Sequence, residues 1–199
     1  MKNSLIIIPA VLVFTLLVTN VYAACLTGDC ENGKGVMTFP DRTEYTGDFK
    51  DGQPNGMGTF IYPKGKNLET GKPFDSAGQT WVQGYPMGEK YVGEVKAGKR
   101  HGYGVLEYEE NNHTYKGYFK DDMFNGKGIM VNPNGVIYEG DFSDNQPNGV
   151  GKVTFPDGRI YEGDVQKNKF HGKGVMIYPD GKRQEGMFED GKYMGEAKK

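Results

Sequence analysis

The sequence predicts an all-β fold, an elongated single antiparallel sheet of stacked β-hairpins. Three observations support this prediction. Glycine is abundant, with 31 residues among 199 and none in the first 24, whereas ~7% is the usual share. Residues 25–199 contain just three Leu and three Ala, the best helix formers, so a mostly helical fold is excluded. A motif with alternating side chains also recurs along the chain, as expected for repeated strands.

The recurring motif begins with an aromatic residue followed two positions later by glycine. Its leading residues are Tyr45, Tyr91, Tyr115, Tyr138, Tyr161 and, in a sixth, degenerate copy, Gln184. From Tyr91 onward the copies are spaced 24, 23, 23 and 23 residues apart, and the 46 residues between Tyr45 and Tyr91 are twice 23. Each unit also carries a Gly-x-Gly, at Gly56/Gly58, Gly102/Gly104, Gly126/Gly128, Gly149/Gly151 and Gly172/Gly174, and Gly33/Gly35 belongs to a partial first unit. About six units of ~23 residues are therefore expected.

Each unit predicts one β-hairpin. In the unit of Tyr138, residues 138–142 alternate as a strand does, residues 144–149 carry turn chemistry, and residues 149–155 form the second strand. Parity places Tyr138, Gly140, Phe142, Gly149, Gly151, Val153 and Phe155 on one face, and Glu139, Asp141, Val150, Lys152 and Thr154 on the other. We expect aromatic rings of neighbouring units to lie across the bare glycines, and carboxylates and lysines to pair on the opposite face.

Units such as 138–142 followed by 148–158 resemble MORN (membrane occupation and recognition nexus) repeats. The resemblance covers roughly residues 28–66 and 91–196. It implies an extended sheet of hairpins used as a binding or scaffolding surface, and the repeat by itself implies no reaction. Phospholipid binding has been proposed for this family and is not uniform within it.

The N-terminus predicts export. Lys2 precedes an apolar run from Leu5 to Val18, and small residues follow at Val21 and Ala23. These features are typical of a secretory signal peptide at residues 1–23, with the array at 24–196 and a tail at 197–199. An uncleaved membrane anchor is the alternative.

Cys25 and Cys30, the two cysteines of the chain, follow this segment. In an oxidising compartment, we favour a disulfide between them. The alternative is lipidation of Cys25, because the residues before it resemble a lipobox in which Tyr22 replaces the usual Leu.

Composition argues against several function classes. The net charge of −2 gives no basic excess for nucleic acid or anionic membranes. His101 and His171 occupy a position that Asn55, Asn125 and Asn148 fill in other units, which we attribute to a shared tolerance for positive φ. His113 completes the histidines, and none of the three serines lies in a nucleophile elbow. We predict no catalytic, cofactor-binding or metal site.

Residues 66–90 interrupt the repeat and contain Trp81 and Tyr85. We favour a decayed repeat, and the alternative is a protruding loop in which these two rings contact a partner. Asn112 begins a glycosylation sequon, which matters if the source is eukaryotic.

Together these observations predict an exported, non-enzymatic repeat protein that binds a protein or a cell-envelope component. Alternatives are a phospholipid-binding membrane protein and an accessory module of an envelope enzyme system. The open edges of the end strands would also allow self-association.

Overall fold

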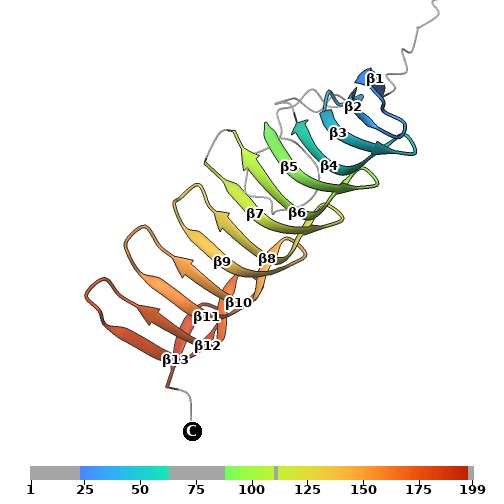
Figure 1. Cartoon of the computed structure of the whole chain (residues 1–199). Helices are drawn as coiled ribbons and strands as arrows, with labels where there is room; N and C mark the ends of the chain where they lie inside the picture. The colour runs from blue at the N-terminus through green and yellow to red at the C-terminus, as the bar shows by residue number, and fades with distance from the viewer. Residues whose placement is uncertain (1–22, 63–87, 110–111, 197–199) are drawn as a thin grey trace, which may run out of the picture.

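The computed structural model describes residues 23–62, 88–109 and 112–196, which form a single antiparallel sheet of fourteen strands. The strands follow one another in chain order from β1 to β14, so consecutive strands are always neighbours in the sheet. Figure 1 shows the result as an elongated array of hairpins running from β1 at one end to β13 and the C-terminus at the other. The predicted all-β fold of stacked hairpins is confirmed.

The strands have the following bounds: β1 Ala24–Gly28, β2 Lys34–Thr38, β3 Glu44–Lys50, β4 Gln53–Tyr62, β5 Glu89–Lys96, β6 Lys99–Tyr108, β7 Thr114–Lys120, β8 Met123–Val131, β9 Ile137–Ser143, β10 Gln146–Thr154, β11 Ile160–Gln166, β12 Lys169–Ile177, β13 Arg183–Glu189 and β14 Lys192–Gly195.

The turn within each repeat is shorter than the sequence predicts. Both of its central residues have positive φ, as in Asp144 (50°) and Asn145 (66°), which is the two-residue type I′ turn that matches the twist of antiparallel strands. The same pairs occur at Asp51-Gly52, Ala97-Gly98, Asp121-Asp122, Lys167-Asn168 and Asp190-Gly191. The prediction of a six-residue turn at 144–149 is therefore wrong, because residues 146–149 already belong to β10.

A bulge bends every full hairpin at its Gly-x-Gly. In the first complete unit Gly47 faces Gly58 and Phe49 faces Pro54, so three residues of β4 oppose one residue of β3. Bulges bend strands, and the bend brings together rings that a straight strand would separate. The ring centroids of Tyr115 and Phe119 lie 5.1 Å apart, although four residues of straight strand span ~13 Å. One face of the sheet is thus concave.

The leading tyrosine of each repeat fills this concave face. Its hydroxyl donates to the main-chain oxygen three residues onward, at 2.6–3.0 Å in all five units. Its ring covers two glycines of its own hairpin: a Cβ on Gly151 would overlap the Tyr138 ring, and one on Gly140 would lie 2.6 Å from the Tyr138 hydroxyl. The rings therefore cover glycines within a hairpin, not those of a neighbouring unit as predicted. We refer to this arrangement as the tyrosine lock.

The concave face holds one continuous core of aromatic and aliphatic side chains. It includes Tyr138, Phe142 and Val153, whereas Glu139, Val150 and Lys152 are exposed on the convex face, as parity predicts. Gly149 is an exception. Its φ of 131° at the bulge directs the Cβ position toward Asp141 on the convex face, so its predicted place on the concave face is wrong.

The two ends of the sheet differ from the middle. Cys25 and Cys30 are joined by a disulfide, with Cα atoms 6.0 Å apart. At the other end Gln184 replaces the leading tyrosine, and Tyr193 of β14 covers Gly186 in its place, donating to the Glu185 oxygen at 3.0 Å. Strands β1 and β14 form the two edges of the described sheet.

Candidate binding surfaces

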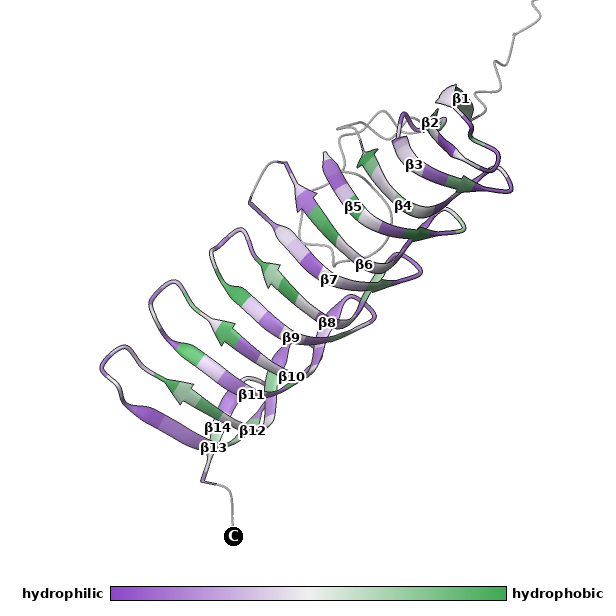
Figure 2. Cartoon of the chain, in the orientation of Figure 1, coloured by the Kyte–Doolittle hydropathy of each residue, from purple (hydrophilic) through white to green (hydrophobic). Residues whose placement is uncertain are grey.

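The convex face is crossed by one row of side chains that pair directly from strand to strand. From β2 to β13 this central row is Val36, Thr46, Thr59, Val92, Val105, Lys116, Ile129, Glu139, Lys152, Glu162, Val175 and Glu185. Its first five members are uncharged, and five of the remaining seven carry charge. Figure 2 shows hydrophobic and hydrophilic residues alternating along the strands of the array, with a hydrophilic run at the start of β13. The convex face therefore divides into an uncharged part and a charged part.

A second convex row lies at the bulges, where an acidic side chain normally holds the bent backbone. Asp48, Glu94, Asp141 and Asp164 accept the main-chain N–H of Met57, Tyr103, Val150 and Lys173 at 2.9–3.0 Å. Burial alone would raise the pKa of Asp141, but its hydrogen bonds from Lys127 and the Val150 N–H lower it overall. These carboxylates satisfy a donor that the bulge removes from the strand ladder.

Tyr118 departs from this pattern, because it stands where four other units have the acid; Met187 holds the same position in the sixth copy. It faces Tyr103 of the neighbouring strand, and the two rings pack edge to face with centroids 5.4 Å apart. Both rings are exposed, Tyr103 at 42% and Tyr118 at 51%. Met57, Val92 and Val105 lie on the same part of the convex face, with Glu94 between Met57 and Tyr103, and Met57 and Val92 are exposed as well. We refer to Tyr103, Tyr118, Met57, Val92 and Val105 as the outer apolar patch.

The concave face in this part of the array is filled by a charged residue at a core position. Arg100 occupies the position of Pro54, Phe124, Pro147 and Phe170 in other repeats, opposite a buried side chain. Its guanidinium lies 3.7 Å from Glu89 and 3.3 Å from Asp122. It also lies over the rings of Tyr62 and Phe119, 5.9 Å and 5.7 Å from their centroids. Burial raises the pKa of the Glu89 carboxyl, and the charge of Arg100 opposes that rise.

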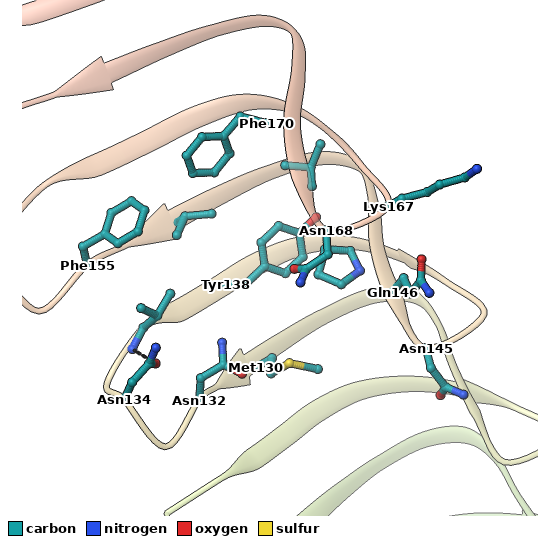
Figure 3. Close-up of a pocket in the computed structure, with 14 residues that line it drawn as sticks. Met130, Asn132, Asn134, Tyr138, Asn145, Gln146, Phe155, Lys167, Asn168 and Phe170 are labelled. Atoms are coloured by element: carbon teal, nitrogen blue, oxygen red, sulfur yellow. Dashed lines mark hydrogen bonds between the residues drawn. The ribbon is translucent and has the colours of Figure 1, made fainter. Parts of the chain in front are cut away.

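Two units further along, the concave face is open. A cavity of about 430 Å³ lies between the β8–β9 connection and the turns that follow β9 and β11. Figure 3 shows Tyr138, Phe155 and Phe170 contributing rings to it, and Asn132, Asn134, Asn145, Gln146 and Asn168 contributing amide groups. Lys167 provides its one cationic side chain, and no carboxylate lines it.

The segments that match a known family model begin and end close to the boundaries of these repeats. The model of the MORN repeat matches residues 31–44, 45–66, 91–113, 115–137, 138–158 and 161–183, which is more than half of the chain. The chain belongs to the MORN-repeat family. MORN repeats are not enzymatic modules.

The curated relatives match this chain over part of its length and over a small part of their own. Alsin from Rattus norvegicus and from Homo sapiens is 31% identical over 100 residues, covering 50% of this chain and 5% of alsin. The ALS2 C-terminal-like protein of Bos taurus is 33% identical over 85 residues, covering 38% of this chain and 8% of the relative. This MORN array therefore spans less than a tenth of the curated relatives it matches.

One solved structure aligns along most of the MORN array. It is the SAS-4 (dCPAP) TCP domain of Drosophila melanogaster, in complex with a proline-rich motif of Ana2. The alignment covers 94% of this chain and 99% of that chain, at 14% identity and a TM-score of 0.31. At that TM-score the likeness carries no argument about fold or partner.

The predicted partner residues Trp81 and Tyr85 lie outside the described residues. Residues 66–87 of the interrupted segment and residues 1–22 of the export signal lie outside them as well. Glu89 and Lys90, which we placed in the interruption, form the start of β5. Asn112, at a φ of 53°, lies in the connection between β6 and β7.

The explanation offered for two histidines is wrong. At His101 and His171, and at the matching asparagines, φ is not positive, because the following glycine of each MORN repeat takes that conformation. His101 lies with its Nδ1 3.6 Å from Asp121. His113 is buried and stacks on Tyr108 with centroids 4.4 Å apart, and burial lowers its pKa to about 4.

Within the described ranges, no group of three potential metal ligands gathers. No helix there has the length and hydropathy to cross a bilayer. Sequence reasoning missed Tyr103, Tyr118, Arg100 and Asn132. Asn132 could have been found as a departure from the aromatic residue of the other MORN repeats, and Tyr118 as a departure from the acid of four of them. The repeats share no single residue at the positions of Tyr103 and Arg100.

Proposed function

We propose that this MORN protein is an exported, non-enzymatic repeat protein that binds a protein partner through its outer apolar patch. The observation that carries the proposal is the pair Tyr103 and Tyr118, two exposed rings in contact on a face where four other bulge positions hold carboxylates. Tyrosines with an apolar surround are the side chains that dominate binding energy at protein interfaces.

The position of Tyr118 supports a role outside folding. Four other repeats use an acid there to accept the bulge N–H. A tyrosine ring provides no such acceptor, so it gives up a hydrogen bond of about 1 kcal/mol and adds an exposed apolar surface. This exchange benefits binding more than stability.

Export rests on the apolar N-terminal segment and on the paired cysteines. Extracytoplasmic proteins keep such disulfides, whereas cytosolic reductants remove them. The intact mass of the secreted chain would distinguish a mature terminus at Ala24 from a lipid-modified Cys25.

The experiment is affinity capture of the full chain from its source cells, comparing the wild type with Tyr118→Asp. We expect the substitution to abolish capture of a partner that the wild type retains. Val150→Ser is the matched control, since Val150 is exposed on the convex face of another repeat, and it should retain that partner.

A second arm tests the membrane alternative. The wild type and Tyr118→Asp are sedimented with phosphatidylcholine vesicles, with and without phosphatidylglycerol. We expect no co-sedimentation, because the chain has no basic excess. Vesicle binding that Tyr118→Asp abolishes would replace the protein partner with a lipid surface.

A further inference from the structure

The concave cavity exists because two core positions of the repeat carry smaller residues. Asn132 stands where other repeats have an aromatic ring: Phe39, Tyr62, Tyr108, Phe155 and Tyr178. Pro147 stands where Phe124 and Phe170 fill the face by stacking on the leading tyrosine, with ring centroids 3.8 Å apart in both cases. Pro54 and Arg100 hold this position in the first two complete hairpins, so the ring of Tyr138 is one of three leading rings without an aromatic cover from the far end of the hairpin. This unit alone combines that gap with the loss of the aromatic residue at position 132.

The walls of the cavity are rich in amides. Asn134 and Asn145 each use their Oδ1 to accept a main-chain N–H, from Val136 at 3.1 Å and from Phe124 at 2.7 Å. Their amide hydrogens remain for other partners. The side chains of Asn132, Gln146 and Asn168 form no hydrogen bond within the part of the chain that the structure describes.

This lining favours a neutral ligand with many hydroxyl groups. A carboxamide offers one acceptor oxygen and two N–H donors, which complements a hydroxyl group that both donates and accepts. Arg159 covers one face of the Phe155 ring and Tyr161 covers one face of the Phe170 ring. The remaining apolar surface of these rings is suited to the C–H faces of a sugar ring. The cavity has no carboxylate to pair with a cationic ligand, and Lys167 is the single cation in its lining to pair with a phosphate.

The cavity is closed along the axis of the array, which favours a compact ligand over an extended chain. The stacked pair of Tyr115 and Phe124 fills the concave face on one side, and that of Tyr161 and Phe170 on the other. A volume of about 430 Å³ lies in the usual range for small-molecule sites.

We propose that this cavity binds a neutral saccharide of one or two sugar rings. Asn132, Gln146 and Asn168 hydrogen-bond its hydroxyl groups, and Phe155 and Phe170 pack against its ring faces. The site lies on the opposite face from the outer apolar patch, so the two proposals stand or fall independently.

The test is saturation-transfer NMR of the whole secreted chain with maltose, cellobiose and N,N′-diacetylchitobiose. At least one of the three should receive saturation from the protein, with a millimolar or tighter Kd. Asn132→Tyr restores the ring found in other repeats and should abolish the signal while the melting temperature is retained. Gln146→Ala should weaken binding roughly fivefold, the equivalent of one lost hydrogen bond.

Asn148→Ala is the control, because Asn148 is exposed next to the site and does not line the cavity; it should bind as the wild type does. A polysaccharide arm, with the sugar that binds immobilised as a chain, distinguishes a glycan end from a free sugar. No signal from any of the three sugars, or a signal that Asn132→Tyr leaves unchanged, would overturn the proposal. Displacement of the sugar by an unstructured peptide at lower concentration would also overturn it, in favour of a peptide site.

Discussion

Strands β4–β8 and strands β9–β12 share one backbone plan and differ on both of their faces. Around β4–β8 the concave face is filled, with Arg100 packed against Tyr62 and Phe119, and the convex face carries the outer apolar patch. Around β9–β12 the concave face is open above Tyr138, and the convex row is formed by charges such as Glu139, Lys152 and Glu162.

This difference separates two kinds of residue in a repeat. The tyrosine lock and the two-residue turns recur in both regions, so they specify the scaffold. Arg100 is the one charged residue at a position that otherwise holds proline or an aromatic residue, Tyr118 stands where four other repeats have an acid, and Asn132 stands where the others have an aromatic ring. Residues that break the register are therefore where a function specific to this chain is expected.

The largest effect is expected from breaking the element that both regions share. Gly151→Ala places a Cβ within the buried ring of Tyr138, and the resulting overpacking should cost about 3 kcal/mol of unfolding free energy. Urea unfolding followed by circular dichroism measures it. Gly181→Ala is the control: its φ is +83° and no atom lies near its Cβ position, so it should cost about 1 kcal/mol. Equal losses would show that the ring contact does not hold the hairpin.

The second effect concerns the charged residue that fills the concave face of β4–β8. Arg100→Phe copies Phe124 and leaves Glu89 buried without its cation, which should cost about 3 kcal/mol. Adding Glu89→Val, which copies Val136, should recover most of this loss, because no buried charge then remains. A double variant as unstable as Arg100→Phe alone would contradict the role assigned to the ion pair.

A third effect, in pH dependence, should distinguish the same two regions. Burial lowers the pKa of His113 to about 4 from 6.5. A histidine whose folded pKa lies below its unfolded value stabilises the fold above the unfolded pKa, and that stability is lost as the pH falls. The wild type should lose about 2 kcal/mol between pH 7 and about pH 5. His113→Val, which copies Val136, should lose less, and parallel pH curves for the two chains would contradict this origin.

Much of the fold could be predicted from local patterns. The spacing of Tyr91, Tyr115, Tyr138 and Tyr161 gives the number of hairpins, and alternation gives the faces of Tyr138 and Glu139. The boundaries failed at Gln146 and Pro147, because proline and asparagine next to a turn were interpreted as part of it. The side of Gly149 failed because a bulge reverses the alternation on which parity depends.

The candidate sites could not be predicted from residue types alone. Tyr118 is one of thirteen tyrosines; alternation places it on the convex face, but its contact with the ring of Tyr103 depends on the pairing of β6 with β7. Asparagine is common in loops, so Asn132 does not stand out by its residue type. The cavity above it also requires the bend of the strands, which brings Asn145 and Asn168 near it from the opposite ends of their hairpins. Trp81, which the sequence suggested as a partner residue, lies outside the described residues.

The measurement that tests the account most directly is the unfolding free energy of Tyr118→Asp. If Tyr118 serves binding and the repeat acid serves the scaffold, the new carboxylate should accept the Lys127 N–H. The unfolding free energy of the variant should then equal that of the wild type or exceed it by up to about 1 kcal/mol. The variant should nevertheless lose its partner. A loss of more than about 2 kcal/mol, the scale of a buried core residue, would contradict the account by making Tyr118 part of the scaffold.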